Sequence, residues 1–214
     1  MDKFVIEGGE RLTGTVKISG SKNAALPLIA ATILQKGLYT ISNVPHLRDI
    51  ATMIKLLGIL GGKTEWVNDT TLRIDTRDLN NHVAPYELVK EMRASQLVLG
   101  SLTGGLKKAT VSYPGGCAIG ERPIDLHLKG LQTLGCDVKI KEGYVEVIAK
   151  NLKGGRITFE TVTVGGTENM LMAASVAKGE TVIENAAREP EVVDLARMLK
   201  MMGARIEGEG TQII

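Results

Sequence analysis

The chain has 214 residues, of which 43% are hydrophobic but only 3% aromatic, so its core must be built from aliphatic side chains. Its net charge is only +2 and its basic residues are dispersed, which argues against a surface for nucleic acid. Two cysteines without metal-ligand spacing exclude a disulfide framework, and the absence of a signal pattern or a long apolar run predicts a cytoplasmic protein with no membrane span.

The sequence contains three copies of one pattern. Gly37–Asn43 and Gly179–Asn185 share Gly, Ile and Asn at an offset of 142 residues. A middle copy is expected at half that offset, and Leu97–Leu99 follows Leu26–Leu28 by 71 residues. Leu134-Gly135 follows Leu60-Gly61 by 74, so the middle copy carries a short insertion. Extra length in one repeat usually marks a binding face.

Each copy predicts a helix, a strand, a second helix and a strand pair. In the first copy these are Asn23–Gln35, Leu38–Ser42, Leu47–Leu60, and Lys63–Val67 with Leu72–Asp75. In the second they are Tyr86–Leu99, Ala109–Ser112, Pro123–Leu134, and Asp137–Lys141 with Val145–Ala149. In the third they are Thr167–Ala177, Thr181–Glu184, Pro190–Met202, and Ala204–Glu207 with Thr211–Ile214.

The first helix of each copy is apolar on nearly every side, as in Ala24–Ala31, and such a helix is buried. The second helices, such as the one beginning near Asp49, are amphipathic and should be partly exposed. We therefore predict an α/β (α+β) fold with buried helices inside and sheets outside, an inside-out arrangement of three repeats.

One loop, Pro114–Pro123, places Cys117 among glycines and close to Arg122. Glycines allow the backbone to approach a ligand closely. A thiol beside a cation and a helix start has a lowered pKa and is suited to act as a nucleophile or an acid. The alternative is a Gly-rich turn with an incidental thiol. Cys136 precedes a predicted strand and is interpreted as a packing residue.

Other charged and polar residues stand at helix starts. Lys22 opens the first buried helix, where a cation is unfavourable without an anion beside it, although a solvated lysine is the simpler reading. Asn23 suits a helix cap. Arg93 lies in a helix expected to be buried and needs a partner, either a ligand or a glutamate nearby. The turn at Gly165 is compatible with anion binding at a helix N-terminus.

Three motifs together resemble the enolpyruvyl transferases, and among them those that act on a UDP-sugar. They are Ile18–Ala25, Pro114–Leu126 and Glu184–Pro190, and the similarity runs through essentially the whole chain. Members of this family are about twice as long and have two lobes of three repeats with the active site between them. The resemblance implies that residues 22–214 form one lobe and that residues 1–21 belong to the opposite lobe.

The resemblance also implies an activity. The enolpyruvyl group of phosphoenolpyruvate would pass to the 3-hydroxyl of UDP-N-acetylglucosamine, the first committed step of peptidoglycan synthesis, without a metal or organic cofactor. Cys117 would be the general acid and the site of alkylation by fosfomycin. The residues implied to bind substrate are Lys22, Asn23, Arg93, Arg122, Pro123, Ile124, Asp125, Leu126, Thr161, Val162, Thr163, Val164 and Gly165.

The family's general base and further arginines come from the other lobe, so we expect these 214 residues to be inactive alone. Two alternatives stay open. One is a lobe that binds a UDP-sugar or a regulatory partner without catalysis. The other is a shikimate-directed enolpyruvyl transferase, which the Pro-Gly-Gly-Cys run disfavours because those relatives lack the cysteine loop.

Overall fold

The computed structural model describes residues 3–9, 11–92, 96–113 and 124–214. The first copy contains α1 (Lys22–Ala31), β1 (Leu38–Ile41), α2 (Arg48–Ile59), β2 (Lys63–Asn68) and β3 (Thr71–Asp75). The second contains β4 (Val83–Ala84), α3 (Tyr86–Glu91), α4 (Leu97–Leu106), β5 (Lys108–Ser112), α5 (Asp125–Thr133), β6 (Asp137–Lys141) and β7 (Tyr144–Ile148). The third contains β8 (Arg156–Thr158), α6 (Val164–Ala174), β9 (Val182–Glu184) and α7 (Pro190–Met201).

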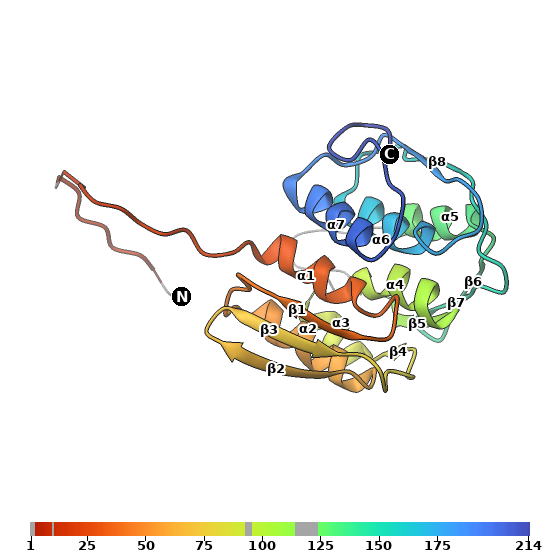
Figure 1. The fold of residues 1–214 in the computed structure, drawn as a ribbon, viewed down its shortest axis with the longest axis horizontal. Coiled ribbons are helices and arrows are strands. Elements are labelled where there is room, and N and C mark those ends of the chain that lie inside the picture. The colour runs from red at the N-terminus through yellow and green to blue at the C-terminus, as the bar shows by residue number, and fades with distance from the viewer. Residues whose placement is uncertain (1–2, 10, 93–95, 114–123) are drawn as a thin grey trace.

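Helices occupy the middle of the molecule and small sheets lie outside them. Figure 1 shows α1, α4, α6 and α7 gathered between the first sheet, ordered β1-β3-β2, and strand β8. The second sheet has the order β4-β5-β7-β6, and β8 pairs with β9 in parallel. Strand β3 buries Leu72 and Ile74, and β7 buries Val145 and Val147, so one face of each sheet covers the helices.

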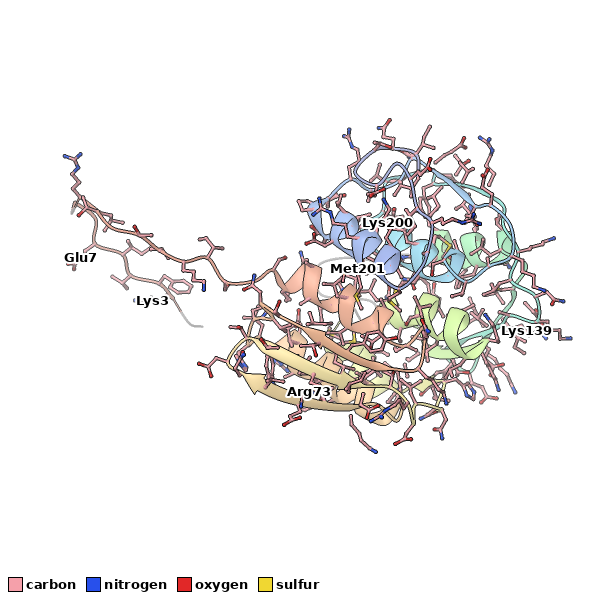
Figure 2. All side chains as sticks on the ribbon, viewed as in Figure 1. Lys3, Glu7, Arg73, Lys139, Lys200 and Met201 are labelled. Carbon is pink, nitrogen blue, oxygen red and sulfur yellow. The ribbon has the colours of Figure 1, made fainter. Side chains whose placement is uncertain are left out.

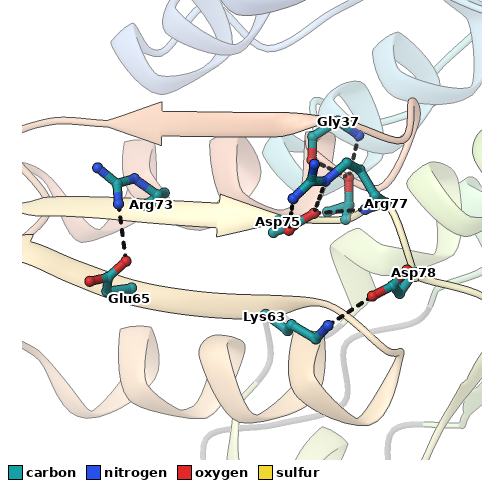
Figure 3. Close-up of polar contacts among 8 residues, drawn as sticks. Gly37, Lys63, Glu65, Arg73, Asp75, Arg77 and Asp78 are labelled. Carbon is teal, nitrogen blue, oxygen red and sulfur yellow. Dashed lines mark hydrogen bonds and ion pairs between the residues drawn. The ribbon is translucent and has the colours of Figure 1, made fainter.

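The outer face of the first sheet is solvated. Arg73 is paired with Glu65 at 3.1 Å, and Lys63 with Asp78 at 2.8 Å, on its exposed side (Figure 3). Pairs exposed to this degree contribute little to stability. The sheet is therefore held by its buried face and its backbone ladder, and these charges keep the outer face soluble.

The first helices of the three copies, α1, α4 and α6, are buried, as the apolar composition of α1 and α6 predicts. Ile29, Ala30 and Ala31 in α1 have no exposed surface, and the side chains of Val98 in α4 and Met172 in α6 are equally inaccessible. Helix α4 packs against both α6 and α1. These helices therefore form the centre of one continuous core, and the amphipathic α2 covers it from outside with its buried face, Ile50, Met53, Leu56 and Leu57.

The repeat also appears in how the second helices end. Gly61, Gly135 and Gly203 follow α2, α5 and α7 with φ of +98°, +87° and +104°. A positive φ of this size favours glycine, because a residue with a Cβ is strained in that conformation. The next N–H in each case reaches back to close the helix: Gly62 to Leu57, Cys136 to Leu131, and Ala204 to Leu199, at 2.9, 3.0 and 3.0 Å. The three copies therefore share one helix-ending motif.

The predicted helix Tyr86–Leu99 is wrong. The structure has a short α3 that ends before an extended Met92, and a separate buried helix, α4, that runs to Leu106. Gly100, Gly104 and Gly105 lower the helix propensity of this segment. They are nevertheless in the helix because a Cβ at Gly100 would collide with Asn169, and at Gly105 with Ile33. Close packing between helices outweighs propensity here.

Elements of the third copy also differ from expectation. Helix α6 begins at Val164 rather than Thr167, because Thr163 caps it with its side chain. The predicted strand pair Ala204–Glu207 with Thr211–Ile214 is wrong. Ile214 instead pairs with Ile183 of β9, and the Thr211 hydroxyl bonds the backbone of Ile213. A side chain that bonds nearby backbone competes with a strand ladder.

The middle copy has the longest connection between its first strand and second helix. Residues 113–124 join β5 to α5, whereas 42–47 and 185–189 join the corresponding elements of the other copies. The insertion predicted from the changing repeat offset is confirmed. It contains the cysteine loop, and residues 114–123 lie outside the described residues.

Glu168 is a carboxyl group enclosed by the core. It lies on α6 and is 4% exposed. Burial, together with the nearby carboxylates of Glu191 and Glu189, raises the pKa of Glu168 to about 8. Between about pH 4.5 and pH 8 the folded protein therefore holds a proton that the unfolded chain has released. The free energy of unfolding must fall as pH rises through this window.

A pair of glycine substitutions tests the close approach of α4 and α6. Gly100→Ala should lower the free energy of unfolding by about 1–3 kcal/mol, because its Cβ has no room beside Asn169. Gly58→Ala on α2 should raise it by about 0.5–1 kcal/mol, because open space surrounds that position. Urea unfolding followed by circular dichroism measures both. Equal effects of the two substitutions would contradict this packing.

Replacing the buried carboxyl tests its protonation. Glu168→Gln should be more stable than the parent at high pH. Its advantage in the free energy of unfolding should increase from pH 5 to pH 9, by on the order of 3 kcal/mol. Urea unfolding at pH 5, 7 and 9 measures this difference. Glu160→Gln is the matched control, because pairing with Lys129 lowers the pKa of Glu160. Parallel pH profiles for the parent and Glu168→Gln would show that Glu168 is ionised in the folded protein.

Candidate functional site

The start of α1 carries Lys22 and Asn23. Ser21 caps the helix by accepting a hydrogen bond from the Ala24 N–H at 3.3 Å, so the expectation that Asn23 is the cap is wrong. Asn23 is left exposed in the first turn. Lys22 Nζ lies 2.7 Å from Asp49 Oδ2 at the start of α2, and both side chains are partly exposed. The lysine therefore has an anionic neighbour within the chain, while its side chain stays partly solvated.

The start of α5 carries Ile124, Asp125 and Leu126. Ile124 is buried, Asp125 is exposed, and Leu126 packs against the edge of the core. The next residue, His127, is 7% exposed. Burial lowers the pKa of His127 to about 4, so the imidazole is neutral at pH 7.

The start of α6 has the features of an anion site. Thr161 and Val162 are exposed, and Thr163, Val164 and Gly165 are partly exposed. The Thr163 hydroxyl accepts the Gly166 N–H at 3.2 Å. The first turn contains no acidic side chain. Backbone N–H groups at such a helix start, together with the helix dipole, favour a negatively charged ligand.

The structure brings the starts of α5 and α6 together. A Cβ placed on Gly165 would lie 3.4 Å from Cε1 of His127. Asn169 bonds both helices, reaching His127 Nδ1 at 3.0 Å and the Gly165 carbonyl at 3.1 Å. The predicted residues Ile124–Leu126 and Thr163–Gly165 are therefore neighbours. Within the described ranges, no hydrogen bond or ion pair joins Lys22 or Asn23 to them.

Four predicted site residues, Arg93, Cys117, Arg122 and Pro123, lie outside the described residues. The other cysteine, Cys136, is 8% exposed, and burial raises the pKa of its thiol to about 11. Its interpretation as a packing residue is confirmed.

The part of the chain that the structure describes offers no candidate for a metal centre or a membrane span. It holds no group of three or more His, Cys, Asp and Glu side chains arranged for a metal ion. None of its helices combines the length and apolarity that a bilayer crossing requires.

Two residues of this region were missed by sequence reasoning. Asp49 had a signal, since an acidic residue in the first turn of an amphipathic helix is available to a neighbouring cation. The sequence also carries a signal at Asn169, because this polar amide, directly before Met170-Leu171-Met172, interrupts an apolar helix. A buried amide requires partners, but the sequence does not identify them.

The chain is similar to known proteins along its length. Residues 6–214 match the family model described as EPSP synthase (3-phosphoshikimate 1-carboxyvinyltransferase). Two curated relatives, from Geobacter metallireducens and Cellvibrio japonicus, are named UDP-N-acetylglucosamine 1-carboxyvinyltransferase. They are 59% and 56% identical over all of this chain, which covers 51% of each. The chain thus spans about half the length of these relatives.

Solved structures agree on the fold. The enolpyruvyl transferase NikO from Streptomyces tendae superposes with a TM-score of 0.81 at 23% identity, over 96% of this chain and 48% of that protein. An EPSP synthase from Acinetobacter baumannii superposes with a TM-score of 0.73 at 18% identity, over 94% of this chain and 46% of that protein. The three-repeat fold and the match of residues 6–214 to the family model lead to one conclusion. The chain belongs to the EPSP synthase family of enolpyruvyl transferases.

Proposed function

We propose that this chain is one lobe of an enzyme that transfers the enolpyruvyl group of phosphoenolpyruvate to the 3-hydroxyl of UDP-N-acetylglucosamine. The observation that carries the proposal is the 59% identity, along the entire chain, to a relative with the corresponding name. The Pro-Gly-Gly-Cys run in the longest of the three connections supports it, because a thiol acid is part of this chemistry in the family.

The starts of α5 and α6 are suited to the nucleotide sugar. Gly165 is partly exposed and lacks a Cβ, so no side chain of its own separates the backbone at the start of α6 from a phosphate. The helix dipoles of α5 and α6 both favour an anion there. Asp125 is exposed beside them and offers a carboxylate to a ribose hydroxyl or a base N–H. In this proposal Ile124–Leu126 and Thr161–Gly165 hold the UDP portion.

Phosphoenolpyruvate needs cations and an acid. Lys22 is partly exposed and held by Asp49, so its ammonium group is positioned at the start of α1 and open to a phosphate. Asn23 is exposed next to it and is available to the sugar. By the family resemblance, Cys117 donates a proton to C3 of phosphoenolpyruvate, and Arg93 and Arg122 bind the substrates.

The other half of the cleft would come from a second lobe. The segment at residues 3–21, described apart from residue 10, leads away from the packed body, as Lys3 and Glu7 show in Figure 2. Its large apolar side chains are exposed to solvent, Phe4 by 96% and Leu12 by 93%. Apolar surface of this kind favours burial against another body. We propose that residues 1–21 pack on the second lobe, while residues 22–214 form this one.

Phosphate release tests the proposed division of the active site. The 214-residue chain alone should release no phosphate from phosphoenolpyruvate and UDP-N-acetylglucosamine. It should do so when mixed with the separately produced remaining half of the Geobacter metallireducens relative. In that mixture Cys117→Ser should lower the rate at least about 100-fold, because the acid is lost. Cys136→Ser, the matched control at a buried thiol, should retain most of the activity of the mixture.

Other results identify other functions. Turnover by the chain alone contradicts the half-site proposal. Binding of UDP-N-acetylglucosamine by calorimetry, with no turnover in any mixture, indicates a binding or regulatory lobe. Phosphate release with shikimate 3-phosphate as the acceptor, and none with the UDP-sugar, indicates a shikimate-directed enzyme.

A further inference from the structure

Asn169 of α6 holds three helices through one side chain. It has no exposed surface, and its Oδ1 accepts the Gly100 N–H of α4 at 2.5 Å. Its Nδ2 lies 3.2 Å from the Gln96 carbonyl, 3.1 Å from the Gly165 carbonyl and 3.0 Å from His127 Nδ1. The start of each of α4, α5 and α6 therefore contributes a partner to the same carboxamide.

These partners fix the orientation of the amide and the tautomer of His127. An N–H group only donates, so Oδ1 must face Gly100, and Nδ2 must then face the two carbonyls. An amide nitrogen accepts no hydrogen bond, so the contact between Asn169 Nδ2 and His127 Nδ1 requires Nδ1 to be the acceptor, with the two N–H groups of Nδ2 shared among three acceptors. The neutral ring then carries its proton on Nε2. A Cβ on Gly165 would lie 3.9 Å from Nε2, which places this donor at the start of α6.

The same amide completes the first turn of α4. At the starts of α1, α2, α5 and α6, the cap carbonyl accepts the N–H four residues later: Ser21 from Ala25, Leu47 from Ala51, Ile124 from Leu128, and Thr163 from Thr167. At α4 the corresponding pair is Gln96 and Gly100. Asn169 bonds both members of this pair, so its carboxamide stands between them.

We infer that Asn169 is a positioning residue for the nucleotide sugar. It sets how the starts of α4, α5 and α6 lie relative to one another, and it holds His127 so that the Nε2–H is offered to the ligand at the start of α6. This inference rests on the proposed function. Asn169 itself is buried away from any ligand and acts through Gly165 and His127.

An apolar residue at position 169 would fill the space without these bonds. A buried amide costs free energy unless its partners are made, and here every polar atom has at least one. His127 Nε2, by contrast, has no hydrogen-bond partner in the described part of the chain, although the residue is more than nine-tenths buried. An unpaired donor next to a helix start is suited to a phosphate oxygen.

Three variants separate positioning from packing. Asn169→Leu removes every side-chain hydrogen bond and keeps the number and branching of the side-chain heavy atoms. Asn169→Asp keeps an acceptor for Gly100 and presents a second one to His127, which moves the ring proton to Nδ1. Ser101→Ala is the matched control, because Ser101 is equally buried on α4 and its hydroxyl bonds only its own helix at Val98.

Two measurements on the 214-residue chain test the inference. Imidazole ¹⁵N NMR should find His127 as the Nε2–H tautomer in the parent and in Ser101→Ala, as the Nδ1–H tautomer in Asn169→Asp, and as a mixture in Asn169→Leu. Calorimetry with UDP-N-acetylglucosamine should give a Kd at least about 10-fold weaker for both Asn169 variants than for Ser101→Ala. Circular dichroism confirms that each variant is folded.

Unchanged affinity in a folded Asn169 variant, or an unchanged His127 tautomer in Asn169→Asp, overturns the inference. Should Asn169→Leu not fold, Asn169→Asp and a pair at the histidine decide it. His127→Gln places an amide N–H near the Nε2 position and should retain more affinity than His127→Leu, and equal losses would overturn the role of Nε2–H. A parent chain that binds no UDP-sugar contradicts the proposed function, while the tautomer measurement still decides whether Asn169 controls His127.

Discussion

Burial of α1, α4 and α6 is the constraint on which the rest of this structure depends. Three helices without a polar face must be shielded from water on all sides, and no single repeat has enough surface to do so. The sheets and the second helices of all three copies are needed to enclose them. A close approach of α4 to α6 at Gly100 is part of the same solution.

Enclosing three helices also decides where chemistry is possible. Their sides are sealed within the core, so only their ends are accessible to a ligand. Ends of helices carry unpaired backbone groups, and the N-terminal ends attract anions. The residues suited to phosphorylated substrates, Lys22 at the start of α1 and Thr163–Gly165 at the start of α6, are at such ends.

The polar groups within this apolar layer are few, and they differ in how they are accommodated. Asn169 is fully paired and links α4, α5 and α6. Glu168, the preceding residue, has carboxylates nearby and is accommodated by keeping its proton at neutral pH. Neighbouring residues on one helix thus represent two ways of burying a polar side chain: hydrogen bonding and neutralisation.

The sequence by itself determined the repeat, the burial of the first helices of the first and third copies, and the insertion that holds Cys117. These follow from local patterns: glycines and asparagines at fixed offsets, and helices with no polar face. The glycine after each second helix is also readable, since its positive φ is a local requirement. Through its resemblance to a family, the sequence also assigned roles to residues such as Lys22 and Arg122.

Only the tertiary structure decided the features that depend on partners distant in the chain. It placed Gly100 within a helix because Asn169 lies against it, and it turned Ile214 toward Ile183 of β9 instead of a neighbouring strand. It paired Lys22 with Asp49 and brought the Asn169 amide within hydrogen-bond distance of His127 Nδ1. Each of these outcomes is set by which groups packing brings within hydrogen-bond distance, and local sequence patterns do not contain that information.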